Sequence, residues 1–327
     1  MAIGGGTGLP AVLAGLKRYL GTAISDLTAV VTVTDDGGSS GRLREELGVP
    51  PPGDIRNCLV ALAEVEPLMG QLFQHRFGGD GALAGHKFGN LFLAALADVT
   101  GSFLQAIRIS SKVLAVRGTI LPSSLDAVRL GAELADGSVV LGESRLAKQG
   151  RQIRRVFLDP ASARAVPEVL EASDRADIVV LAPGSLYTSL VPNLLVGGVA
   201  EALAATGALK VYAANLMSEP GETDDLSLAD HLEAIRSHGG RGSVDGVVVQ
   251  GRSLTADVLD RYAAVGARPV PVDRERIHTL GVWIAEADLT GPTELARHHP
   301  EKLGHALVRL MRHRGPARRV ARARGAA

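Results

Sequence analysis

A β-branched apolar run at residues 28–33 (TAVVTV) leads directly into the polar segment TDDGGSSGRLR at residues 34–44. Such a run is typical of a strand buried on both faces of a parallel sheet. Open α/β sheets bind ligands beyond the carboxyl ends of their strands, which is where this segment lies. Its glycine amides, serine hydroxyls and guanidinium groups suit phosphate. The segment therefore predicts a phosphate or nucleotide site, with candidate ligand-binding residues Asp35, Asp36, Ser39, Ser40, Arg42 and Arg44.

The neighbouring carboxylates Asp35 and Asp36 leave two roles open. They fit the oxygen ligands that Mg²⁺ prefers, and they fit acceptors for ribose hydroxyls. A flexible, solvated surface loop is the structural alternative for the whole segment. The position at a strand end favours the ligand site.

Apolar runs alternate with helical patterns along most of the chain. Buried strands are expected at residues 177–181, 210–214 and 246–250, and an edge strand near 282–284. Helices are expected between them, at residues 194–205, 228–237 and 256–263. This order predicts an α/β fold with a mostly parallel sheet. The pair Asp136-Gly137 between two alternating runs is a hairpin signal, and it predicts a small β-hairpin excursion at about residues 113–142.

Composition excludes several classes of function. The 327 residues fit a single domain at 1–313, followed by a basic tail at 314–327 that is expected to be disordered. Only 3% of the residues are aromatic and the formal net charge is zero. We therefore expect neither base stacking with single-stranded nucleic acid nor attraction to DNA or an anionic membrane.

The single cysteine, Cys58, fits a reducing compartment. No signal peptide is recognisable at the N-terminus. The longest apolar stretch, residues 194–205, is too short to span a bilayer. These features predict a cytoplasmic protein without a transmembrane segment.

The N-terminal sequence GGGTGLPA at residues 4–11 contains the G-x-G-x-x-A spacing of a dinucleotide-binding turn. A helix is expected at residues 10–19, and the amides at its start favour an anion. The acidic residue usual about twenty positions later is not in register, so the dinucleotide motif alone is a weak match. The candidate ligand-binding residues here are Gly5, Gly6, Thr7 and Gly8.

Two further helix starts carry polar side chains. Asp54 is expected to be the N-cap of a helix, with Arg56 and Asn57 in its first turn. Anion binding and a purely structural role are equally open for these two residues. His86 and Lys87 stand beside glycines before the apolar helix at residues 91–97, another start that suits an anion.

The predicted strand at 177–181 ends in a loop of small residues that includes Ser185 and Thr188, which repeats the phosphate-binding chemistry. The loop lacks the G-x-S-x-G nucleophile elbow, so hydrolase chemistry is rejected. A third polar loop, residues 215–223, follows the predicted strand at 210–214. On the next helix, Asp230 is expected to cap, and no metal site is predicted at His231 and His238.

Seven strings in the right order resemble one known family across almost the whole chain. They are GGGTGL (4–9), TDDGGSSGRLR (34–44), PPGDIRNC (51–58), GHKFGNL (85–91), PGSLYTSLVPNLLV (183–196), NLM (215–217) and PGET (220–223). The chain resembles the bacterial gluconeogenesis factor family, within the 2-phospho-L-lactate transferase superfamily. The resemblance implies a Rossmann-like three-layer α/β/α fold and a nucleotide-containing ligand. It also implies roles in gluconeogenic growth, cell shape and cell-wall synthesis, with UDP-sugars, in particular UDP-N-acetylglucosamine, as ligands.

The resemblance adds site residues to those above. Its strings place Asn90, Gly184, Asn193, Asn215, Glu222 and Thr223 at the site. Arg297 is the best match for the family's UDP-sugar arginine. The family's Arg-His-Asp-Pro appears here as residues 297–300 with His299 in place of aspartate, which puts a carboxylate role there in doubt.

Three functions compete at this point. The favoured one is a regulatory protein, expected to be a homodimer, that binds a nucleotide sugar without a required cofactor and contacts partners in wall synthesis. The second is a metal-dependent phospholactyl-type transferase that uses Mg²⁺ held by Asp35 and Asp36. An NAD-dependent oxidoreductase fits Gly6 and Gly8 but lacks a recognisable acid–base set. No catalytic residue is assigned.

Overall fold

The computed structural model describes residues 1–64, 67–146, 152–291 and 295–314. Seven strands form one sheet in the order β10-β9-β8-β7-β1-β2-β3, and every neighbouring pair is parallel. In chain order the strands are β1 (Ala2–Gly4), β2 (Thr28–Val31), β3 (Thr119–Pro122), β7 (Ile178–Leu181), β8 (Leu209–Ala213), β9 (Gly246–Gln250) and β10 (Trp283–Ala287). The predicted α/β class is therefore confirmed.

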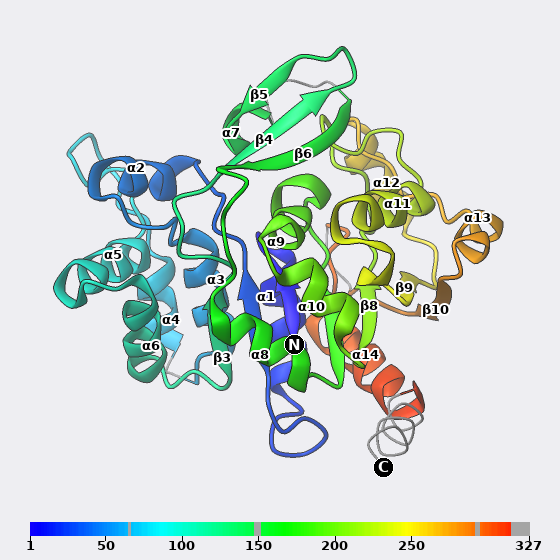
Figure 1. Cartoon of the computed structure of the whole chain (residues 1–327), viewed down its shortest axis with the longest axis horizontal. Helices are drawn as coiled ribbons and strands as arrows, with labels where there is room; N and C mark the ends of the chain where they lie inside the picture. The colour runs from blue at the N-terminus through cyan, green and yellow to red at the C-terminus, as the bar shows by residue number, and fades with distance from the viewer. Residues whose placement is uncertain (65–66, 147–151, 292–294, 315–327) are drawn as a thin grey trace.

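Helices cover both faces of this sheet (Figure 1). Successive strand residues point to opposite faces, so Val30 packs in one core cluster while Ala29 and Val31 pack in the other. One face is covered by α1 (Gly8–Lys17), α3 (Gly53–Leu62), α4 (Pro67–Gln74), α5 (Phe88–Thr100), α6 (Phe103–Val113) and α14 (Pro300–Arg314). The other is covered by α8 (Pro167–Arg175), α9 (Val191–Leu195), α10 (Val199–Ala205), α11 (Leu228–Gly239) and α13 (Arg274–Thr279). The predicted three-layer arrangement follows from this alternation.

A small antiparallel sheet projects from the main body, at the top of Figure 1. Its strands are β4 (Arg129–Leu134), β5 (Val139–Leu141) and β6 (Ile153–Asp159), in the order β5-β4-β6. The hairpin predicted at Asp136-Gly137 joins β4 to β5. The bounds differ from the predicted 113–142, because β3 pairs with β2 in the main sheet and the third strand extends the excursion to Asp159.

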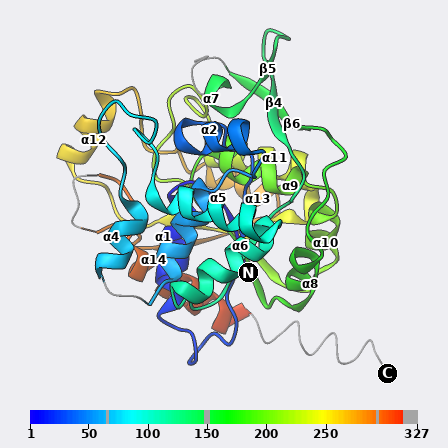
Figure 2. The same cartoon turned by 90° about the vertical axis from the view of Figure 1, so that its left-hand side faces the viewer.

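The helix α2 (Gly38–Leu47) lies beside α7 (Glu143–Leu146), the short helix of this excursion (Figure 2). The backbone N–H of Ser144 on α7 donates to Oδ1 of Asp36 at 2.8 Å. This bond joins the excursion to the segment before α2. The remaining helix, α12 (Ala256–Ala263), precedes α13. Among the described residues, no helix combines the length and apolar character needed to cross a bilayer. The predicted tail at 315–327 lies outside the described residues.

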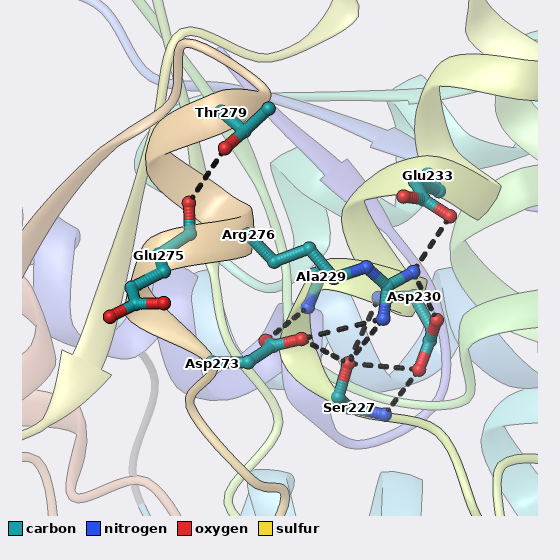
Figure 3. A network of polar contacts seen from close by, with 8 residues as sticks. All are labelled: Ser227, Ala229, Asp230, Glu233, Asp273, Glu275, Arg276 and Thr279. Atoms are coloured by element: carbon teal, nitrogen blue, oxygen red, sulfur yellow. Dashed lines mark hydrogen bonds and ion pairs between the residues drawn. The ribbon is translucent and has the colours of Figure 1, made fainter.

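An ion network fixes α13 against α11 (Figure 3). Arg276 on α13 bonds Asp230 at 2.6 Å and Glu233 at 2.9 Å on α11. Ser227 and Asp230 form a capping box at the start of α11, so the predicted capping role of Asp230 is confirmed. Oδ1 of Asp273 also accepts the N–H of Ala229 at 3.0 Å. The network therefore joins two helix starts on one face of the sheet.

The helices α1 and α14 cross at unusually short range because glycines meet there. A Cβ on Gly15 would overlap the carbonyl group of Pro300, and a Cβ on Gly304 would lie 2.6 Å from the carbonyl carbon of Gly15. Backbone atoms cannot rotate away as a side chain can. This crossing fixes the position of α14, whose preceding segment carries Arg297.

We predict that Gly15→Ala lowers the free energy of unfolding by about 1–3 kcal/mol, the usual cost of overpacking. Gly70→Ala is the matched control, because it lies inside α4 and nothing stands within 4 Å of its Cβ position. That control should gain about 0.5–1 kcal/mol from helix propensity. Urea unfolding of both variants measures the difference, and equal midpoints would contradict the close crossing.

Candidate functional site

The strand order places a crevice beside β1. From β1 the chain runs outward through β2 to β3 on one side, and β7 lies on the other, which makes this the switch point where open sheets bind ligands. The turn after β1 packs directly against the loop after β7, since a Cβ on Gly8 would overlap the carbonyl of Pro183. Glycine at this position is therefore a steric requirement.

A cleft of about 490 Å³ opens at this crevice. It brings together three of the predicted loops, the first glycine-rich turn and the loops after β7 and β8, and joins them to the segment before α14. Residues from the prediction that line it are Thr7, Gly8, Gly184, Asn215 and Arg297. The structure thus collects residues that are almost 300 positions apart in the chain.

Asn215 holds two walls of the cleft together. Its Oδ1 accepts the N–H of Gly184 at 3.1 Å, and its Nδ2 donates to the carbonyl oxygen of Gly184 at 2.8 Å. The hydroxyl of Tyr212 adds a third bond at 3.3 Å. The ring of His298 lies 3.1 Å from the carbonyl oxygen of Ala214, which anchors the neighbouring Arg297. Asn215 therefore shapes the cleft as well as lining it.

Two glutamates lie at the loop after β8. The hydroxyl of Ser185 lies 2.8 and 2.7 Å from the two carboxylate oxygens of Glu219, and Glu222 accepts the N–H of Tyr187 at 2.6 Å. Burial, followed by the negative charge of Glu219, raises the pKa of Glu222 to about 8. Thr223 is completely buried, and its hydroxyl accepts the N–H of Glu219 at 2.9 Å. Glu222 and Thr223 thus stabilise this loop from within.

Asp54 does not cap its helix as predicted. The helix α3 begins at Gly53 after Pro52, and the Oδ2 atom of Asp54 instead accepts the N–H of Gly6 at 2.7 Å. The side chain of Asp54 bonds this distant N–H rather than one of its own helix, because α3 starts directly beneath the turn after β1. Burial raises the pKa of Asp54 to about 6, the Gly6 bond opposes this shift, and the charge of Asp35 adds to it.

The predicted metal pair Asp35 and Asp36 is held by different elements. Oδ1 of Asp35 accepts the N–H of Gly37 at 2.9 Å, whereas Oδ1 of Asp36 accepts the N–H of Ser144 at 2.8 Å. Within the residues that the structure describes, no three Asp, Glu, His or Cys side chains form a group that could hold a metal ion. A metal role for the pair stays a prediction.

Glu143 was missed by the sequence analysis. It lies on α7 among these carboxylates, and burial together with the charges of Asp35 and Asp54 raises the pKa of Glu143 well above its usual value. Its Oε2 atom is shielded from solvent and has no hydrogen-bond partner. No sequence motif marks Glu143, because only the folding of the excursion places it beside the turn after β1.

The residues predicted around α2 and α5 bind one another. The hydroxyl of Ser39 lies 3.1 Å from Nδ1 of His86 and accepts from Asn90 at 3.0 Å. Arg56 donates to Asn90 at 2.7 Å and to Asn57 at 2.6 Å, and all of these side chains except Asn57 are buried. The contacts favour the structural interpretation that the sequence left open for Arg56 and Asn57.

Four further predicted residues make contacts with the backbone. Arg42 donates to the carbonyl oxygen of Ala84 at 2.7 Å, and Arg44 donates to that of Val128. Ser40 accepts the N–H of Gly53 at 3.2 Å. Asn193 is completely buried and donates to the carbonyl oxygen of Ser189 at 2.8 Å. These bonds hold the loops in place, and a direct role in ligand binding stays a prediction for each residue.

Four other predicted residues do not line the cleft. The backbone N–H of Gly6 is occupied by Asp54, and Gly5 packs so closely that a Cβ would lie 2.6 Å from the same carboxylate. Thr188 is buried. Lys87 reaches Gln74 at 3.5 Å. The cleft also contains residues that were not predicted: Glu219, Tyr262 and His298.

The raised pKa of Asp54 predicts a pH-dependent stability. The unfolded pKa is 3.8 and the folded one about 6, so the folded protein holds this proton more tightly. The contribution of Asp54 to folding stability is complete below pH 3.8, and it is lost as the pH rises through 6. Asp54→Asn keeps an acceptor for the N–H of Gly6. We expect its free energy of unfolding to exceed that of the wild type by about 3 kcal/mol at pH 8 and to equal it near pH 3.5.

Urea unfolding at the two pH values measures this difference. Asp98→Asn, at an exposed position of α5, is the control and should show no such dependence. A stability gain for Asp54→Asn of the same size at both pH values would show that the ionisation of Asp54 is not its cause.

Comparison with known proteins agrees with this architecture. The family model of 2-phospho-L-lactate transferase CofD matches residues 1–290. A gluconeogenesis factor from Halalkalibacterium halodurans is 48% identical over 309 residues, which cover 94% of this chain and 95% of the relative. The gluconeogenesis factor of Bacillus subtilis is 45% identical over 310 residues, which cover 94% and 96%.

A solved structure has the same fold. The crystal structure of a Bacillus halodurans protein, 48% identical in sequence, superposes with a TM-score of 0.91 over 94% of this chain and 98% of that one. The similarity therefore extends from the sequence to the whole sheet and its covering helices. With a family model that spans most of its length and relatives at 45% identity or more, this chain belongs to the 2-phospho-L-lactate transferase CofD family.

Proposed function

We propose that this chain binds a nucleotide sugar of the UDP-N-acetylglucosamine type in the cleft beside β1 and regulates metabolism in response. One observation carries the proposal. The cleft of about 490 Å³ joins the glycine-rich turn, the loops after β7 and β8, and Arg297 at the switch point of the sheet. Its volume suits a ligand of this size.

The electrostatics of the cleft support a diphosphate. The helix α1 begins at Gly8, its N-cap residue Thr7 makes no side-chain bond to the first turn, and that turn contains no acidic residue. The helix dipole therefore gives the start of α1 a partial positive charge at the cleft, although Pro10 has no N–H and that of Leu9 bonds the carbonyl oxygen of Gly5 at 3.4 Å. Arg297 is exposed and adds a guanidinium group that can bind phosphate oxygens in bidentate fashion.

The cellular role is inferred from relatives. Those from Halalkalibacterium halodurans and Bacillus subtilis are named gluconeogenesis factors. We infer that this chain likewise serves growth on gluconeogenic carbon sources. A connection to cell shape and cell-wall synthesis would follow from a UDP-N-acetylglucosamine ligand, since that nucleotide sugar is a wall precursor.

A phospholactyl-type transferase is the second candidate. The family model carries that activity in its description, and the carboxylates Asp35, Asp36, Asp54 and Glu143 gather beside the turn after β1. Mg²⁺ often binds one or two carboxylates together with substrate phosphates. Asp35 and Asp36 accept hydrogen bonds from different backbone amides, and we assign no step to a metal.

The first functional prediction concerns the ligand. Thermal unfolding with UDP-N-acetylglucosamine, UDP-glucose, GDP and NAD, each with and without Mg²⁺, compares the candidates. Ligand at about a hundred times its Kd should add about 2.7 kcal/mol to the stability of the folded state. We expect a raised Tm with the UDP-sugars, independent of Mg²⁺ and without turnover by mass spectrometry. A shift that occurs only with GDP and Mg²⁺ would instead support the transferase.

The second functional prediction concerns Arg297. Arg297→Ala should weaken the binding of UDP-N-acetylglucosamine about tenfold or more, since it removes charge-assisted hydrogen bonds to phosphate. The Tm without ligand should stay the same, because the side chain is exposed. Isothermal titration calorimetry measures the affinity, with Arg312→Ala at an exposed position of α14 as the control. Unchanged affinity in Arg297→Ala would move the diphosphate away from this cleft.

A further inference from the structure

Glu219 differs in charge from the rest of the cleft. Among the described residues that line the cleft, it is the sole carboxylate, while Thr7, Gly8 and Arg297 offer amides, a hydroxyl and a cation. A carboxylate repels phosphate, so anion binding cannot explain its presence there. It must either serve the structure alone or accept hydrogen bonds from an uncharged part of the ligand.

The side chain of Glu219 is held in one place. The hydroxyl of Ser185 lies 2.8 and 2.7 Å from its two carboxylate oxygens. The backbone is fixed as well, because Glu219 donates its N–H to the buried hydroxyl of Thr223 at 2.9 Å. One hydroxyl supplies one proton, so both carboxylate oxygens keep acceptor capacity for further donors.

Glu222 is the second glutamate of this loop. Burial, followed by the negative charge of Glu219, raises the pKa of Glu222 to about 8. Glu222 is in turn bound by the N–H of Tyr187 at 2.6 Å. Glu222 is therefore engaged inside the loop, and Glu219 is the glutamate of the two that lines the cleft.

We propose that Glu219 determines specificity for a ribonucleotide by accepting hydrogen bonds from the two vicinal ribose hydroxyls, with Ser185 as its positioning residue. Two adjacent hydroxyls match the two oxygens of one carboxylate. In a nucleotide the ribose is bonded directly to the phosphate. A phosphate at the start of α1 and at Arg297 would therefore place the ribose within the same cleft as Glu219. This inference rests on the nucleotide ligand proposed above.

The test compares UDP with 2′,3′-dideoxy-UDP by calorimetry. The two compounds share uracil and diphosphate and differ only in the vicinal hydroxyls. Wild type should bind UDP at least about tenfold more tightly, because hydrogen bonds to a charged group are lost with the dideoxy compound. Glu219→Gln, which keeps an acceptor for Ser185, should reduce this ratio several-fold. It should not weaken the binding of 2′,3′-dideoxy-UDP, because the substitution removes a charge that repels the diphosphate.

Two further variants separate positioning from folding. Ser185→Ala should also reduce the ratio, to a smaller extent, since Glu219 loses its fixed orientation. Glu201→Gln, at an exposed position of α10 outside the cleft, should keep the wild-type ratio. A Tm equal to that of the wild type shows that a variant is folded.

The outcomes distinguish this inference from the proposed function. A wild-type ratio near one, or a Glu219→Gln variant that keeps the full ratio, overturns the role of Glu219 while nucleotide binding stands. A wild type that binds neither UDP nor UDP-N-acetylglucosamine overturns the nucleotide ligand and this inference together. Loss of affinity for both UDP compounds in Glu219→Gln would assign Glu219 to the structure of the cleft and also overturn its role.

Discussion

The close contact between the turn after β1 and the loop after β7 determines where this protein can bind a ligand. Gly8 has no room for a side chain against Pro183, so the two loops meet along their backbones. Because β1 and β7 are neighbours in the sheet, this contact brings the start of α1 to the loops of the other half of the domain. The side chain of Asn215 then bonds both the N–H and the carbonyl oxygen of Gly184, which holds the loops after β7 and β8 together. These contacts form the cleft between the start of α1 and the loops after β7 and β8.

The second constraint is the cost of burying carboxylates. Asp54, Glu143 and Glu222 are each brought near other acids, and burial raises the pKa of all three. Asp54 and Glu222 recover part of this cost through backbone N–H donors, Gly6 and Tyr187. Glu143 recovers none at its Oε2 atom. Such groups are retained at a cost in stability, which is common where a site needs them.

The sequence predicted the features that are local. The strands, the hairpin at Asp136-Gly137 and the capping role of Asp230 follow from residue patterns within a few positions, and the structure confirms them. The contacts that the sequence did not predict are long-range. Asp54 binds Gly6 from 48 positions away rather than its own helix, and Asp36 binds Ser144 from 108 positions away. No local pattern reports a partner at such a distance, so Glu143 could not be placed at all.

The acids around the cleft affect how well it can hold the nucleotide that we propose as its ligand. Ionised carboxylates near the cleft would repel a diphosphate, and at short range that repulsion is strong in a poorly hydrated site. A pKa of about 8 for Glu222 reduces the negative charge that the site carries near neutral pH, whereas Asp54, with a pKa of about 6, stays mostly ionised there. Glu219 is the carboxylate that faces the cleft itself, where Arg297 and the first turn of α1 supply opposing positive charge. The burial of Glu222 thus costs folding stability and at the same time lowers the repulsion that the proposed anion would meet at the cleft.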